Sequence, residues 1–238
     1  MDTDIEIIYK NRQKEIDDFL ILLSEFDRME KNVELASNFK TLFPKLKYSD
    51  MVNVLKSNFF LMLYNLIEYT ISSLINRVFF EIEDCKLSYI DVNEAIRKSW
   101  AYAKFKIIKY DNHVNFNTII KKNEEIIKFI LDKQVISLDS KSVLPGGNLD
   151  GTAICDTFCR IGVSIDTNNE FYRPDILQSI KRTRNNLAHG ENSFGEALRD
   201  KTINDLQKEK EIIFAFLDQL FNKINDYLEQ ESYKYCKH

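Results

Sequence analysis

Apolar residues recur every three or four positions along most of the chain, with charged residues between them, as in amphipathic helices. This spacing predicts helices over residues 4–29, 87–110, 116–133 and 198–233. The stretch 51–80 is apolar on more than one face, so we expect it to be a central helix that is buried on several sides. The pattern therefore predicts an all-α fold, a helical bundle.

The helical pattern weakens in two places. Residues 30–47 contain Pro44 and predict a looser connection. Residues 134–169 contain the turn-forming run 145–147 and predict a loop-rich insertion with one short helix. This insertion leads to a helix whose first turn begins at Pro174, where the ring fits without loss of a hydrogen bond.

The composition agrees with a helical domain of ordinary size. The chain has 238 residues, of which 44% are hydrophobic, enough to bury a sizeable core, and it has only 6 Gly and 3 Pro. It shows no internal repeat and no flexible linker. We therefore expect one domain over residues 1–238, with the loop-rich insertion at 134–169 and a flexible tail at 234–238.

Charge and hydropathy narrow the classes of function. The net charge of -4 argues against a protein that coats nucleic acid nonspecifically, although it leaves room for a local basic groove. The N-terminal residues are acidic, and no apolar run approaches the roughly 20 residues that span a bilayer, so we expect a cytoplasmic protein without a membrane partner. The cysteines show no metal-ligand spacing, and we expect reduced thiols, no metal and no cofactor: Cys85, Cys155, Cys159 and Cys236.

Candidate chemistry is concentrated in the run from Arg184 to Gly190. Histidine can take or give a proton near neutral pH, and arginine stays charged and can bind a phosphate through two donors. Asn185 lies four residues before His189, on nearly the same helix face, and can orient it. Arg184 lies roughly 140° around an ideal helix from His189. An intact helix would therefore not direct both side chains to one point. We expect either that Gly190 ends the helix in a left-handed conformation, or that a symmetric partner completes the site.

A structural interpretation of the same residues stays open. A histidine in the last turn of a helix often only stabilises the negative end of the dipole, and an arginine beside an asparagine often only faces solvent. Glu68 poses a similar question, because a carboxylate in the apolar stretch is costly to bury unless it is paired. It is predicted to pair with Arg184 or another basic residue near the motif, or else to point to water.

Basic and aromatic residues alternate over 87–110. Such a surface can hold a single nucleic-acid strand by phosphate contact and base stacking. We favour the other interpretation, in which the aromatic rings lie in the core and the lysines face solvent.

The spacing Arg184-x4-His189, followed by Gly190 and Glu191, resembles the Arg-x4–6-His signature of the HEPN superfamily. These helical ribonuclease and nucleotide-binding domains occur across prokaryotic defence systems and in eukaryotic RNA-cleaving proteins. Asn185 matches the polar residue usual after the arginine, and RNNLAHGENSFGEA is similar to the stand-alone prokaryotic HEPN-type nucleases, as is YNLIE around Glu68. The resemblance covers most of the chain as a pattern of helices, but only the motif is specific.

The resemblance implies a HEPN-like helical bundle that acts as a metal-independent endoribonuclease. Two protomers would pack their motif helices together, so that both copies of Arg184 and His189 line one cleft and cleave RNA by attack of its own 2′-OH. Asn185 would orient His189 or bind the phosphate. Three more residues are expected to contact substrate: Arg182, Asn186 and Glu68. An antitoxin or another defence-system partner is also expected.

Three other classes stay open. The chain is alternatively a non-catalytic dimerisation or RNA-binding module that keeps the motif, an enzyme that acts on a mononucleotide, or a toxin whose activity depends on a partner protein. RNA cleavage, mononucleotide turnover and growth arrest on expression distinguish these classes.

Overall fold

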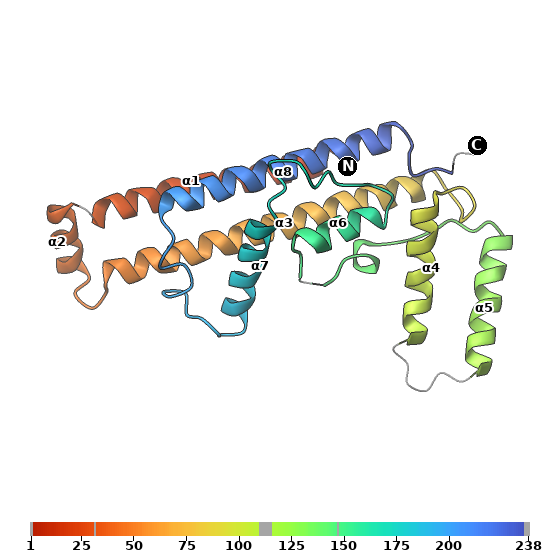
Figure 1. The fold of residues 1–238 in the computed structure, drawn as a ribbon, viewed down its shortest axis with the longest axis horizontal. Coiled ribbons are helices and arrows are strands. Elements are labelled where there is room, and N and C mark those ends of the chain that lie inside the picture. The colour runs from red at the N-terminus through yellow and green to blue at the C-terminus, as the bar shows by residue number, and fades with distance from the viewer. Residues whose placement is uncertain (1, 31, 110–115, 147, 236–238) are drawn as a thin grey trace. The chain divides into compact units, whose positions relative to one another are not determined.

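The computed structural model describes residues 2–30, 32–109, 116–146 and 148–235. Within them the chain is all-α, as predicted, with two isolated β-bridges (Figure 1). The helices are α1 (Asp2–Glu30), α2 (Val33–Leu42), α3 (Tyr48–Asp84), α4 (Glu94–Lys109), α5 (Phe116–Leu131), the short 3₁₀ helix η1 (Ser140–Ser142), α6 (Gly151–Cys159), α7 (Pro174–Ala188) and α8 (Ile203–Glu229). None of the helices described here is long and apolar enough to cross a membrane.

The chain folds as two compact units. The first comprises residues 1–70, 149–151 and 168–218, and the second comprises residues 71–148, 152–167 and 219–238. Helices α3 and α8 each contribute residues to both units. One domain over residues 1–238 stays a prediction.

The first unit is built from α1, α2, α7 and the first parts of α3 and α8. Helix α1 runs alongside α8, where the fully buried Tyr9 donates a 2.8 Å hydrogen bond from its hydroxyl to Asp218 Oδ1 (Figure 1). Apolar side chains spaced three or four apart fill the space between the helices. The largest buried ones include Ile16, Leu23, Phe59, Phe60, Leu63, Leu66 and Phe216. The apolar stretch 51–80 is thus largely buried, as its composition predicts.

Helix α2 corrects the prediction that residues 30–47 are loosely structured. Its N-cap is Asn32, whose side-chain oxygen accepts hydrogen bonds from the backbone N–H groups of Glu34 and Leu35 at 3.1 and 3.2 Å. No residue of α2 is buried. The helix has only 10 residues, and Pro44 follows shortly after its end, so the turn signal of the proline outweighs a short helical pattern.

Helix α4 begins at Glu94 and not at residue 87 as predicted. Asn93 explains the difference, since its side-chain oxygen accepts a 3.0 Å hydrogen bond from Ile96 N and caps the helix. Its amide nitrogen donates to Tyr227 Oη at 2.8 Å and to Ser232 O at 2.9 Å. The segment before α4 is therefore held by the end of α8, a contact that local spacing does not reveal.

Helix α8 is shorter at both ends than residues 198–233. Thr202 Oγ1 accepts from Asp205 N at 3.2 Å, while Asp205 Oδ2 accepts from Thr202 N at 2.9 Å, so the two residues form a reciprocal cap. Beyond the helix, Tyr235 N donates to Asp91 O at 2.8 Å. Tyr235 thus has a partner although it falls in the tail predicted to be flexible; residues 236–238 of that tail lie outside the described residues.

The predicted insertion, residues 134–169, contains η1 and α6 between loops. Ser140 N donates to the side-chain oxygen of Asn76 on α3 at 2.8 Å. Val143, Ile154 and Phe158 are buried in the second unit. The insertion is loop-rich, as predicted, and these three apolar side chains belong to the core of that unit.

We predict that Gly162→Ala destabilises the protein. Gly162 follows α6 with φ +89°, and a Cβ there would lie 2.9 Å from Asn93 Nδ2. The left-handed backbone alone costs a non-glycine residue about 1–2 kcal/mol. Urea unfolding followed by circular dichroism should show a lower midpoint. Gly146→Ala is the matched control, because its Cβ would meet nothing within 4 Å. Equal midpoints for the two variants would contradict the prediction.

Candidate functional site

The motif lies in the second half of helix α7. Pro174 occupies the first turn, and five residues at helical spacing face the core of the first unit: Ile176, Leu177, Ile180, Thr183 and Leu187. This buried face fixes the rotation of the helix about its axis. The polar residues between the buried ones are consequently left half-buried or exposed, which brings the motif to the surface.

The helix ends in a Schellman motif directly after the predicted catalytic residues. Glu191 N donates to Asn186 O at 2.8 Å, and Gly190 N donates to Leu187 O at 3.3 Å. Gly190 has φ +71°, which confirms the expected left-handed conformation. His189 is the C-cap residue and is exposed. The imidazole is therefore accessible at the end of a well-defined helix.

Arg184 is held by two neighbours. Its guanidinium carbon lies 4.9 Å from the centre of the Tyr64 ring, and its Nη1 donates to Asn185 Oδ1 at 2.9 Å. A cation over an aromatic face gains from the negative charge of the ring face, and gains more where water is excluded. Tyr64 is fully buried on α3. The buried ring and the Asn185 side chain together hold the motif arginine in place.

Tyr64 also links Arg184 to Glu68. The Tyr64 hydroxyl donates to Glu68 Oε1 at 3.1 Å and accepts from Leu149 N at 3.5 Å. Burial raises the pKa of Tyr64 to about 12, with the negative charge of Glu68 adding to the rise and the positive charge of Arg184 opposing it. Glu68 is half-buried. Glu68 therefore contacts the motif only indirectly, through Tyr64. Within the described part of the chain it makes no ion pair with Arg184.

Sequence reasoning did not identify Tyr64 as part of the site. The signal was present, because Tyr64 and Glu68 are four residues apart and share a helix face. The segment YNLIE contains both, but a buried tyrosine at helical spacing looks like an ordinary core residue. Only its contact with a residue of another helix distinguishes it.

The remaining predicted site residues differ in their surroundings. Arg182 is exposed. In the orientation that satisfies its amide, Asn186 donates from its nitrogen to Glu191 Oε2 and to Arg182 O, both at 3.1 Å. Asn186 therefore supports the helix end. Its predicted contact with substrate stays a prediction, as do the roles predicted for Arg184, Asn185, His189 and Glu68.

Lys181 and Asp150 form an ion pair that sequence reasoning did not identify. Lys181 Nζ lies 2.6 Å from Asp150 Oδ2, and both side chains are mostly buried. The pair ties α7 to the segment 149–151, whose Leu149 also contacts the Tyr64 hydroxyl. The ion pair thereby joins α7, which carries the motif, to the same segment 149–151 that contacts Tyr64.

Helix α4 agrees only partly with the interpretation favoured from the sequence, in which its aromatic rings lie in the core and its lysines face solvent. Trp100 is buried, with Lys104 Nζ 5.5 Å from its ring centre, and Arg97 donates to two backbone carbonyl oxygens. Tyr102, in contrast, is 51% exposed. The side chains of Lys106, Lys109 and Tyr110 lie outside the described part of the chain.

The described residues contain no group of three or more His, Cys, Asp or Glu side chains that could hold a metal ion. What the site offers in one chain is an exposed imidazole, a guanidinium held on a buried ring and a carboxamide beside it. These groups can transfer a proton and bind an anion.

Tyr64 should ionise at about pH 12, above its ordinary value of 10.0. As the pH rises, Tyr64 ionises in the unfolded chain before it ionises in the folded chain. The contribution of the buried, neutral Tyr64 to the free energy of unfolding is therefore fully present below pH 10.0 and is lost as the pH rises towards 12. The phenolate absorbance curve of the wild type minus that of Tyr64→Phe should have its midpoint near the higher value. In concentrated denaturant the same difference curve should return to 10.0. A folded-state midpoint at the ordinary value would show that Tyr64 is not buried against Glu68.

A model of the MAE_28990-like HEPN family matches residues 2–233, and therefore covers helices α1 to α8 and the motif. No curated protein and no solved structure matches the chain. HEPN domains commonly dimerise and bind RNA, and they are often nucleases. The match confirms the resemblance that the motif suggested. The chain belongs to the MAE_28990-like HEPN family.

Proposed function

We propose that the chain is a metal-independent endoribonuclease whose site forms at the interface of a homodimer. The observation that carries the proposal is the arrangement at the end of α7, where Arg184 is held over the buried Tyr64 and His189 is exposed at the helix end. A fixed cation and an accessible imidazole are the groups that cleavage of RNA requires. The family match supports the same class of activity.

The proposed reaction uses the nucleophile that RNA itself carries. One His189 removes the proton of a 2′-OH, the 2′-oxygen attacks the adjacent phosphorus, and the bond from phosphorus to the 5′-oxygen breaks. A second His189 donates a proton to the departing 5′-oxygen. Both Arg184 guanidiniums stabilise the negative charge that grows on the phosphoryl oxygens. The products are a 2′,3′-cyclic phosphate and a 5′-hydroxyl.

The need for two protomers follows from the geometry of one helix. Arg184 and His189 are five residues apart, and α7 stays helical as far as Ala188. The two side chains leave such a helix in directions roughly 140° apart. One chain also carries only one motif histidine, whereas the reaction uses a base and an acid. A symmetric pair of α7 helices supplies both in one cleft.

The neighbouring residues have supporting roles in this proposal. Asn185 positions Arg184 through the hydrogen bond from Nη1 to Oδ1, and it either orients His189 or contacts the phosphate. Arg182 adds positive charge for RNA from its exposed position. Glu68 acts through Tyr64, and Asn186 acts at the substrate or through the turn that presents His189.

We further propose a cytoplasmic role in prokaryotic defence or in a toxin–antitoxin pair, with an antitoxin or another defence protein as partner. The resemblance of RNNLAHGENSFGEA to stand-alone HEPN-type nucleases supports this context. Unregulated cleavage of cellular RNA would damage the host cell, so a nuclease of this kind needs a controlling partner.

The second candidate is a non-catalytic HEPN module for dimerisation or RNA binding. The observation that favours it is the engagement of motif side chains in structural contacts. Asn185 Oδ1 accepts from Arg184, and Asn186 holds Glu191 at the helix end. In that case the motif would stabilise α7 and contact RNA without cleaving it.

The proposal predicts cleavage of RNA in EDTA by the wild type. His189→Ala should lower the rate by about 10²–10⁴-fold, because it removes the acid and the base. Arg184→Ala should lower it by about 10²–10³-fold, because charge on phosphorus is no longer stabilised. The measurement is gel analysis of labelled RNA, with identification of cyclic-phosphate ends.

DNA of the same sequence is the substrate control, since it lacks the 2′-OH and should stay intact. Arg199→Ala is the control variant, because Arg199 is exposed and follows the motif without being part of it. RNA that is bound but stays intact would favour the non-catalytic module. Cleavage that both motif variants retain would remove the catalytic roles of Arg184 and His189.

A composite site also predicts inhibition by an inactive protomer. When wild type is allowed to exchange subunits with a large excess of Arg184→Ala/His189→Ala, most wild-type chains pair with a variant and lose half of the site. The cleavage rate per wild-type chain should then fall steeply. An unchanged rate, with exchange verified by a size tag, would mean that each chain works alone.

A further inference from the structure

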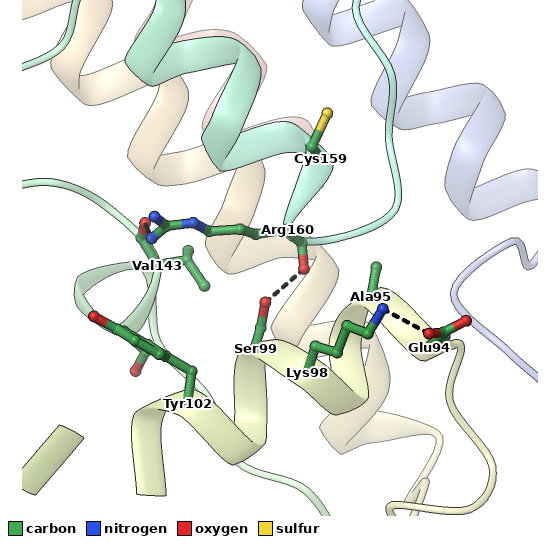
Figure 2. A pocket seen from close by; sticks show the side chains of 9 residues that line it. Glu94, Ala95, Lys98, Ser99, Tyr102, Val143, Cys159 and Arg160 are labelled. Carbon is green, nitrogen blue, oxygen red and sulfur yellow. Dashed lines mark hydrogen bonds and ion pairs between the residues drawn. The ribbon is translucent and has the colours of Figure 1, made fainter. Parts of the chain in front are cut away.

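A pocket of about 670 Å³ opens in the second unit, between α4, η1 and the end of α6 (Figure 2). Its volume falls in the range of sites that bind small molecules. None of the residues that line it belongs to the motif on α7. Ala95 and the ring of Tyr102 supply apolar surface, and Glu94, Lys98 and Arg160 supply charge.

The walls of the pocket are fastened to one another by hydrogen bonds. Ser99 on α4 is buried, and its Oγ donates to Arg160 O at 2.6 Å (Figure 2). Arg160 Nη1 donates to Val143 O at 2.8 Å. Arg160 thus joins α4 to the segment after η1. A site whose walls are already joined loses little conformational freedom when a ligand binds.

Among the described residues that line the pocket the net charge is positive, because Arg160 has no carboxylate paired with it. Lys98 Nζ lies 2.6 Å from Glu94 Oε1, so these two charges largely cancel (Figure 2). In the described part of the chain, no carboxylate pairs with Arg160, and its guanidinium makes one hydrogen bond, to Val143 O. A guanidinium has five donors, so most of them remain for an anion. The pocket therefore favours a negatively charged group.

The aromatic wall adds a second preference. The Tyr102 ring lines the pocket and remains half exposed, although Trp100, two residues before it on α4, is buried. A planar ring stacked against tyrosine gains from offset aromatic contact and from removal of apolar surface from water. Ala95, which is half-buried, provides an apolar contact for the same ligand.

We propose that this pocket binds a small aromatic anion, with the ring against Tyr102 and the carboxylate, sulfonate or phosphate on Arg160. The shape supplies room for one such molecule, the remaining donors of the Arg160 guanidinium supply selectivity for the anion, and Tyr102 supplies selectivity for the ring. The site uses residues of the second unit only and does not depend on the proposed ribonuclease activity.

Fluorescence titration of the full chain tests this proposal with two probes that share one ring system. Anilinonaphthalene sulfonate carries the anion, and phenylnaphthylamine is the same molecule without it. The sulfonate should bind about tenfold more tightly, since a charge-assisted hydrogen bond is lost in the neutral probe. Phenyl phosphate should displace the sulfonate probe, whereas inorganic phosphate at the same concentration should not.

Three variants and one control variant connect this binding to the pocket. Arg160→Gln should abolish the preference for the charged probe, and Tyr102→Ala should weaken both probes by about tenfold. Lys128→Gln is the matched control, since it also removes one positive charge from an exposed side chain of the second unit, outside the pocket. Arg160→Lys keeps the charge and should keep part of the preference.

Equal affinity for the two probes, or the same affinity in Arg160→Gln, Tyr102→Ala and wild type, would overturn the proposal. If inorganic phosphate displaced the sulfonate probe as well as phenyl phosphate does, the proposed preference for an aromatic ring would be overturned. The helical circular dichroism of each variant must match that of the wild type. If Arg160→Gln unfolds, Arg160→Lys and Tyr102→Ala replace it, and wild-type affinities for both probes in these two variants would overturn the proposal.

Discussion

The contact between Arg184 and the buried ring of Tyr64 is the interaction on which the candidate site depends. An arginine side chain has several rotatable bonds, and on a bare helix surface its charge would be spread over many positions. The Tyr64 ring limits that freedom, and Asn185 limits it further through Nη1. Tyr64 is itself held at its hydroxyl by Glu68 and Leu149. The motif cation therefore takes its position from the core of the first unit.

The histidine is presented by a different physical means. His189 is exposed and stands at the C-cap, where the left-handed Gly190 turns the chain away. Exposure keeps the imidazole within reach of solvent and of a second molecule. A fixed cation combined with an accessible proton carrier suits a reaction in which the phosphate must be located before a proton moves. It also suits a site that is completed by another copy of the chain.

The accuracy of the sequence-based predictions followed the range of the interactions involved. Most helices, the start of α7 at Pro174 and the left-handed Gly190 were predictable, because they depend on side chains within one or two turns. Helix α2 was missed because it has only 10 residues and Pro44 follows it closely. The start of α4 was misjudged because Asn93 is held by residues near the end of α8. Helix boundaries that rest on distant partners leave no local spacing to read.

The sequence by itself determined the all-α class, the chemical groups available in the motif and their order along one helix. These properties depend on residue identity and on a period of 3.6 residues, both of which are local. Only the tertiary structure decided that Tyr64 stands between Arg184 and Glu68, that Lys181 pairs with Asp150 and that Arg160 lines a pocket. Each of these depends on packing between segments far apart in the chain. Such contacts are selected by the burial of whole helices, and no spacing within one helix specifies them.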